Sequence, residues 1–164
     1  MSTQPIIFAL VTFLHDLFTA VWIGGLIAIG ITFLPAARQA LGQGPEMKKL
    51  MDLVQRRQSL LVFVSIVGLA ITGALQANRN PTYQGLFNFS NAYSAALALK
   101  HILVLAMVAI TLFRSLVLGR RQGLSTPSRE RLSVRLLFLN IVLGIAVLLV
   151  SGVIVALGAG SPLA

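Results

Sequence analysis

Four apolar segments dominate this sequence, and each is close to the roughly 20 residues that an α-helix needs to cross a bilayer. They cover about residues 6–34, 60–77, 92–113 and 136–157. The pattern predicts an all-α integral membrane protein in which residues 1–164 form a single four-helix transmembrane bundle. Because His15 and Asp16 interrupt the first segment, we expect a membrane helix there rather than a signal peptide.

The composition supports a membrane location and excludes several kinds of site. Hydrophobic residues make up 57% of the chain and charged residues only 10%, whereas about 25% of the residues of a soluble domain are charged. The chain has no cysteine, so disulfides, zinc–thiolate sites and cysteine-ligated iron–sulfur clusters are excluded.

The net charge of +9 is concentrated in two of the three segments that join the apolar stretches. An excess of Lys and Arg marks the cytoplasmic loops of membrane proteins. We therefore expect the first and third loops to be cytoplasmic and both termini to be periplasmic. Anionic lipid headgroups, and not nucleic acid, are the expected neighbours of these charges. Eleven of the 13 basic residues belong to the two loops: Arg38, Lys48, Lys49, Arg56 and Arg57 in the first, and Arg114, Arg120, Arg121, Arg129, Arg131 and Arg135 in or beside the third.

The only two histidines of the chain, His15 and His101, lie inside the first and third apolar segments. These two helices are expected to be parallel, and each histidine comes nine or ten residues after the expected outer end of its helix. A rise of 1.5 Å per residue places both imidazoles about 14–15 Å below the outer surface. Two histidines at one depth on parallel helices are candidate ligands for a shared metal or haem.

Charged residues stand directly beside both histidines. Asp16 follows His15 and Lys100 precedes His101. A lone charge inside a membrane is costly, so we expect Asp16 and Lys100 to form a charge pair, or Lys100 to hold an anionic group of a ligand such as a porphyrin propionate. Trp22 lies on nearly the same helical face as His15 and is expected to line the site.

Haem b and copper both accept imidazole ligands. Copper conduction usually uses soft thiolate or thioether ligands as well. The chain has no cysteine, and Met107 is about 120° away from the His101 face on an ideal helix. The residue pattern therefore favours haem b over a copper pore.

A structural role explains the same residues without a cofactor. A buried histidine often only satisfies a hydrogen bond, and Asp16 with Lys100 can be a structural ion pair. The chain would then be a non-catalytic subunit that packs against partner membrane subunits or against a second copy of itself.

Several stretches resemble the CopD-type copper-resistance membrane domain. The first is "LHDLFTAVWIGGLIAIGITFLPAAR", in which His15 and Trp22 form a His-x6-Trp-x-Gly-Gly pattern. Similar stretches follow in the other three segments, namely "GLAITGALQA", "LALKHILVLAMVAI" and "FLNIVLGIAVLLVSG". The resemblance implies copper uptake or copper tolerance at the bacterial inner membrane, with copper as the bound species.

The chain is more distantly similar to the HemJ-type protoporphyrinogen oxidases, which are also four-helix membrane proteins. The shared features are the His-x6-Trp start and a lysine in the third helix, here His15, Trp22 and Lys100. This resemblance implies that the histidine binds haem or porphyrin and that the lysine serves the oxidation of a tetrapyrrole. Whether the chain is an enzyme stays open at this point.

Overall fold

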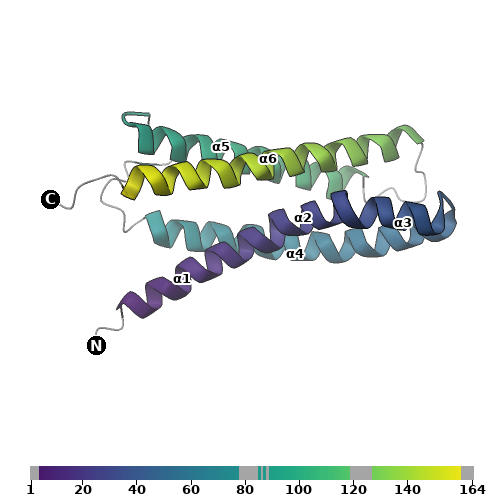
Figure 1. Cartoon of the computed structure of the whole chain (residues 1–164), viewed down its shortest axis with the longest axis horizontal. Coiled ribbons are helices and arrows are strands. Elements are labelled where there is room, and N and C mark those ends of the chain that lie inside the picture. Colours follow the sequence, from purple (N-terminus) through teal and green to yellow (C-terminus); the bar gives the residue numbers. More distant parts are fainter. Residues whose placement is uncertain (1–3, 78–84, 86, 88, 119–126, 160–164) are drawn as a thin grey trace. The chain divides into compact units, whose positions relative to one another are not determined.

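The computed structural model describes residues 4–77, 85, 87, 89–118 and 127–159. The chain divides into two compact units, Met1–Asn80 and Pro81–Ala164. We call them unit 1 and unit 2 and describe each by itself. The elements within the described residues are all helical, as predicted. Each unit is a hairpin of two long helices (Figure 1).

The first arm of unit 1 is helical from Gln4 to Leu41 and includes two π-helical turns, in which the helix is locally widened. Gly42 ends this arm. Its φ of 66° is a left-handed conformation that favours glycine, and its N–H donates to the carbonyl of Arg38 at 3.0 Å. The sequence of elements in the arm is α1 (Gln4–Thr19), η1 (Ala20–Gly24), α2 (Gly25–Ile27), η2 (Ala28–Phe33) and α3 (Leu34–Leu41).

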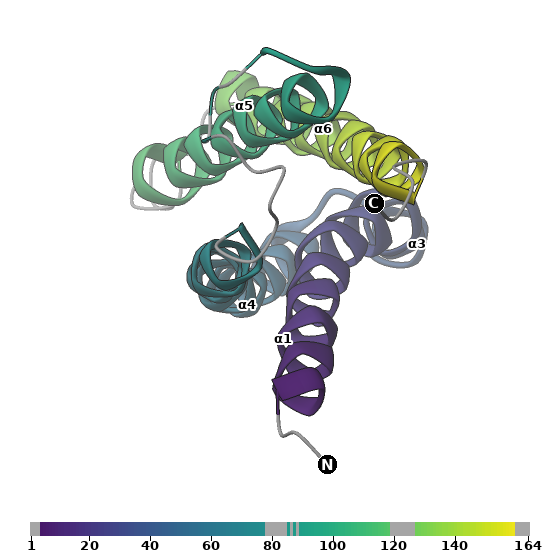
Figure 2. The same cartoon turned by 90° about the vertical axis from the view of Figure 1, so that its left-hand side faces the viewer.

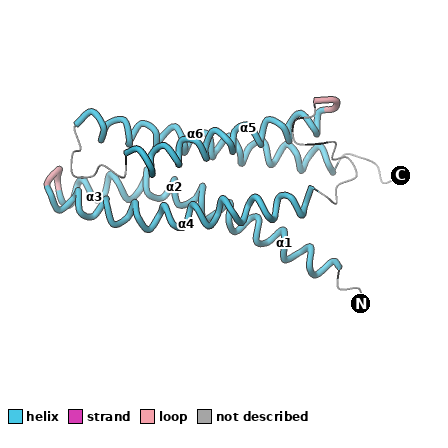
Figure 3. The backbone as a smooth tube through the Cα atoms, turned by 180° about the vertical axis from the view of Figure 1, so that it is seen from behind, coloured by secondary structure: helices cyan, strands magenta, loops and turns pink. Residues whose placement is uncertain are grey.

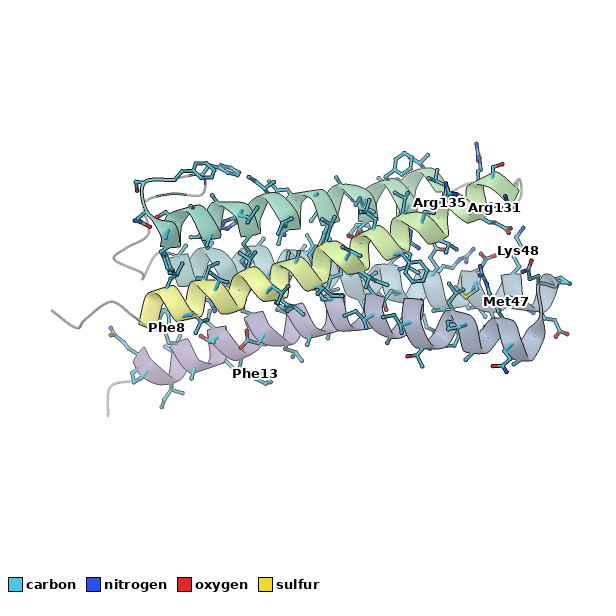
Figure 4. All side chains as sticks on the ribbon, turned by 45° about the horizontal axis from the view of Figure 1, so that its top comes forward. Phe8, Phe13, Met47, Lys48, Arg131 and Arg135 are labelled. Carbon is cyan, nitrogen blue, oxygen red and sulfur yellow. The ribbon has the colours of Figure 1, made fainter. Side chains whose placement is uncertain are left out.

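The second arm of unit 1 is the single helix α4 (Pro45–Ala77). It begins well before residue 60, where hydropathy alone placed the start of the membrane segment. The preceding residues are charged but favour helix, so the helix continues beyond its apolar part. Met47 and Lys48 lie on its first turns (Figure 4).

Small side chains on α4 form the face that packs against α1. Val62, Ser65, Gly68 and Thr72 are buried and recur every three or four residues. Small residues at this spacing let two helices approach closely inside a membrane. The N-terminal part of α1 diverges from α4 (Figures 2 and 3), and α1 has no buried residue.

Unit 2 pairs α5 (Ala92–Phe113), extended by the π-helical turn η3 (Arg114–Leu118), with α6 (Pro127–Ala159). The side chain of Asn91 caps α5 by accepting a hydrogen bond from the Ser94 N–H at 2.7 Å. The bounds of α5 match the predicted segment 92–113. Helix α6 extends the predicted segment 136–157 at both ends.

Within the described residues, four helices are long and apolar enough to cross a membrane: Gln4–Leu41, Pro45–Ala77, Ala92–Val117 and Ser128–Leu157. Large apolar side chains stay exposed along them, as Val64 on α4 and Leu149 on α6 illustrate. In water such a surface would drive aggregation, whereas in a bilayer it faces lipid. The predicted multi-pass character therefore holds by length and composition.

Most of the basic residues expected in loops stand on helices. Lys48, Lys49, Arg56 and Arg57 are exposed on the first turns of α4. In unit 2, Arg131 and Arg135 are exposed on the first turns of α6 (Figure 4). The loop assignment was wrong for the four residues on α4 and for Arg131, because the helices extend past their apolar parts, whereas Arg135 was expected at the start of a helix. Outside the described residues lie Arg79, Arg120 and Arg121.

Candidate functional site

His15 is held against α4 by a side-chain hydrogen bond. Its Nδ1 lies 2.9 Å from Oγ1 of Thr72, which is 5% exposed. The Thr72 hydroxyl donates its single proton to the carbonyl of Gly68 at 2.7 Å, so its oxygen accepts from Nδ1–H of His15. In the neutral imidazole the lone pair is then on Nε2.

His101 has the same protonation pattern in unit 2. Its Nδ1 lies 2.7 Å from the carbonyl oxygen of Leu97, one turn earlier on α5. A carbonyl oxygen only accepts, so Nδ1 carries the proton and Nε2 of the neutral ring carries the lone pair. Both histidines are half-buried.

An Nδ1–H that is hydrogen-bonded to an oxygen, with Nε2 left as the basic nitrogen, is the usual state of a metal-ligating histidine. The outer partner fixes the tautomer and the ring orientation. The sequence identified the two histidines but not their partners. Thr72 stands out in the sequence as a hydroxyl on an apolar helix, although its bond to His15 does not, and the Leu97 carbonyl carries no sequence signal.

Each histidine lies a similar number of helical turns from the first residue of its own helix. His15 lies about three turns from the first residue of α1, and His101 about two and a half turns from the first residue of α5. The two distances from the helix starts differ by about half a turn, and the equal depth of the two histidines in a membrane stays a prediction.

The two charged neighbours differ in their exposure. The side chain of Asp16 is exposed on α1, whereas Lys100 is half-buried on α5. Asp16 comes one residue after His15, so it leaves the helix about 100° away from the histidine that contacts α4. The Asp16–Lys100 charge pair stays a prediction.

Trp22 is the most deeply buried aromatic residue that the sequence singled out, with 2% of its surface exposed. It lies in the π-helical turn η1. Its Nε1–H is buried, and no hydrogen-bond partner for it is found among the described residues. A buried donor without a partner costs about 1–3 kcal/mol, so this atom marks a place where a further group is expected.

The Phe18 ring separates His15 from Trp22 along the seam of unit 1. It packs directly on Gly68, in the space that a Cβ at that position would occupy. On one side of this contact, His15 lies beside Thr72 and Gly73. A Cβ added at Gly73 would be 3.7 Å from Cε1 of His15. Trp22 comes after Phe18 on the other side.

Unit 2 has a buried polar pair that the sequence analysis missed. Nδ2 of Asn140, which is 0% exposed, donates to Oγ1 of Thr111 at 3.0 Å. A single asparagine within the apolar run of α6 was the available signal. Among the described residues, Oδ1 of Asn140 and Nε of Arg114 have no hydrogen-bond partner.

In the part of the chain that the structure describes, no group of three or more His, Asp or Glu side chains is close enough to hold a metal ion. Haem b needs only two protein ligands, because the porphyrin supplies four nitrogens to the iron. A neutral imidazole, as each unit offers one, is a known axial ligand of haem iron, and a haem shared by the two rings stays a prediction.

Comparison with family models, with curated proteins and with solved structures gives no match for this chain.

Proposed function

We propose that this chain is a haem b-binding electron-transfer protein of the bacterial inner membrane. It crosses the bilayer four times as one bundle, with both termini in the periplasm. The single observation that supports the haem site is the shared state of the two histidines. In each, Nδ1–H is bonded to an oxygen, so Nε2 is the nitrogen that can bind iron.

His15 and His101 are the proposed axial ligands. Thr72 and the Leu97 carbonyl hold the two rings in the ligating tautomer. Lys100 offers a positive charge, next to His101 in the chain, for a haem propionate. Trp22 is buried on the far side of the Phe18 ring and is proposed to border the haem site there. Haem b would supply one-electron transfer between a quinol or periplasmic donor and a partner protein.

Copper is the second candidate, because the His-x6-Trp-x-Gly-Gly stretch resembles the CopD-type domain. Two imidazoles with Nε2 as the basic nitrogen also bind copper. Copper usually takes further soft ligands such as thiolates, and the chain has no cysteine to provide them. For this reason we place haem first. Tetrapyrrole oxidation of the HemJ type is a further alternative, with His15 binding haem or porphyrin and Lys100 steering the propionates.

The visible spectrum of the purified protein tests the proposal. The protein is isolated in mild detergent and measured oxidised and dithionite-reduced, together with metal analysis. A Soret band with sharp reduced α and β bands is expected, and these bands should be lost in His15→Ala and in His101→Ala. Ser151→Ala is the control, because among the described residues that hydroxyl donates to the Val147 carbonyl of its own helix.

The other outcomes separate the alternatives. A colourless protein that carries copper supports the CopD-like function. A colourless protein without metal excludes both the haem site and the copper site. The remaining function is that of a structural subunit, in which the histidine variants change stability or assembly alone. Complementation of a strain that lacks protoporphyrinogen oxidase tests the HemJ-like activity.

A further inference from the structure

Three polar atoms of unit 1 are buried, and none of them has a hydrogen-bond partner among the described residues. They are Nε1 of Trp22, Nε2 of Gln58 and Oγ of Ser65. Trp22 is 2% exposed and Ser65 is 1% exposed. Buried polar side chains nearly always have a partner, so three such atoms in one hairpin require an explanation.

Two contacts between the arms of unit 1 place the three residues in one stretch of the seam. Phe18 packs on Gly68 at one end of this stretch, and the Gln58 side chain lies against Gly25 at the other. Trp22 comes between Phe18 and Gly25 on the first arm. Ser65 comes between Gln58 and Gly68 on α4, two helical turns after Gln58. The three atoms without a hydrogen-bond partner therefore belong to the same short segment of the hairpin.

The local backbone is also unusual at this point. Trp22 lies in the π-helical turn η1 (Ala20–Gly24). Such turns are rare in proteins and are frequent at functional sites, because the widened turn redirects side chains. The π turn and the unpartnered indole are independent observations, and they coincide at Trp22.

The chemistry of the three groups defines the missing partner. The indole N–H of Trp22 only donates, and the amide nitrogen of Gln58 donates as well. The hydroxyl of Ser65 donates or accepts. A single oxygen that accepts two hydrogen bonds would be a partner for both N–H donors of this stretch. None of the three groups carries a charge, so the partner is expected to be neutral.

We infer that Trp22, Gln58 and Ser65 form a binding site for a neutral oxygen acceptor inside unit 1. The oxygen belongs either to an internal water or to the carbonyl group of a bilayer-dissolved molecule such as a quinone. A water would accept from Trp22 and Gln58 and donate to Ser65, which gives three hydrogen bonds, a typical number for an internal water. The Phe18 ring on Gly68 separates this site from His15, so the inference does not depend on the haem proposal.

Trp22 is the only tryptophan of the chain, so it is a specific probe of the site. In protein labelled with ¹⁵N at the indole, the proton–nitrogen correlation spectrum contains a single indole cross-peak. A hydrogen-bonded indole N–H resonates downfield of a free one. The peak is recorded in detergent with and without a short-chain benzoquinone, and its magnetisation transfer to water is measured.

Either of two results supports the inference. Transfer between the indole proton and a long-lived water, without a response to the quinone, identifies the acceptor as water. A saturable downfield shift on addition of the quinone identifies it as a carbonyl. A resonance at the position of a free indole, with neither response, overturns the inference.

Variants connect the signal to the other two residues. Ser65→Ala and Gln58→Leu should each move the indole resonance toward the free position and weaken quinone binding, where it occurs, by about tenfold. Matched controls are Gln76→Leu on α4 and Ser151→Ala on α6, which should leave the peak in place. If a variant does not fold, the two measurements on the unmodified protein still decide the question. Because the readout does not use the haem spectrum, failure of either proposal leaves the other intact.

Discussion

Oγ1 of Thr72 accepts a hydrogen bond from Nδ1 of His15 at 2.9 Å while its own proton goes to the Gly68 carbonyl at 2.7 Å. A threonine on one helix therefore fixes the tautomer of a histidine on the other. Nε2 becomes the basic nitrogen of that ring. The bond connects two residues that are 57 positions apart in the sequence.

Thr72→Val removes the acceptor while keeping the side-chain volume. We expect the affinity for haem or metal to fall about 10- to 100-fold, because the imidazole loses the partner that orients it. Thr72→Ser should keep most of the affinity. Titration of the purified apoprotein with haem, followed at the Soret band, measures the change.

The control for this prediction is Thr19→Val. The Thr19 hydroxyl donates to the backbone carbonyl of His15 at 2.9 Å, so this bond goes to the main chain of the histidine and not to its imidazole. If Thr19→Val weakened binding as much as Thr72→Val, general loss of packing rather than the tautomer would be the cause.

Gly68→Ala should destabilise the hairpin of unit 1. The new Cβ would occupy the space of the Phe18 ring, and the ring would have to move. Overpacking of this kind costs about 1–3 kcal/mol. The matched control is Gly24→Ala, because a Cβ at Gly24 meets nothing within 4 Å. Thermal unfolding in detergent compares the two, and an equal effect of both substitutions would contradict the proposed contact.

The Asn140–Thr111 hydrogen bond should stabilise unit 2. Thr111→Val removes the acceptor and leaves Nδ2 of Asn140 buried without a partner. Hydrogen bonds between membrane helices contribute about 0.6 kcal/mol on average and at most about 1.7 kcal/mol. A double-mutant cycle with Asn140→Leu measures the coupling. A coupling of zero would show that the bond does not contribute to stability.

The distribution of basic residues predicts that the turn between α3 and α4 is cytoplasmic. Because the chain has no cysteine, single cysteines report topology without background. Gln43→Cys should react with a membrane-impermeant maleimide only after the inner membrane is permeabilised. Phe87→Cys, at an exposed position before α5, should react in intact spheroplasts. The reverse pattern would show that the orientation is inverted.

The positions of the helices could be predicted from the sequence to a large extent. The predicted segment 92–113 coincides with α5, and the other three segments lie within longer helices. Hydropathy marks the part of a helix that sits in the membrane. It does not mark where the helix itself ends, because helix formation depends on local backbone hydrogen bonds and residue propensities. For this reason α4 starts at Pro45, in a charged region.

The sequence by itself determined that the chain is helical, that four of its helices are apolar enough to cross a membrane, and that His15 and His101 are exceptional within them. These properties are local, since each depends on residues within a few turns of one another. Only the tertiary structure decided which side chains meet across each helix pair. The bond from His15 to Thr72, the contact of Phe18 with Gly68 and the bond from Asn140 to Thr111 depend on the register and rotation of two packed helices, and a helical sequence pattern does not specify these.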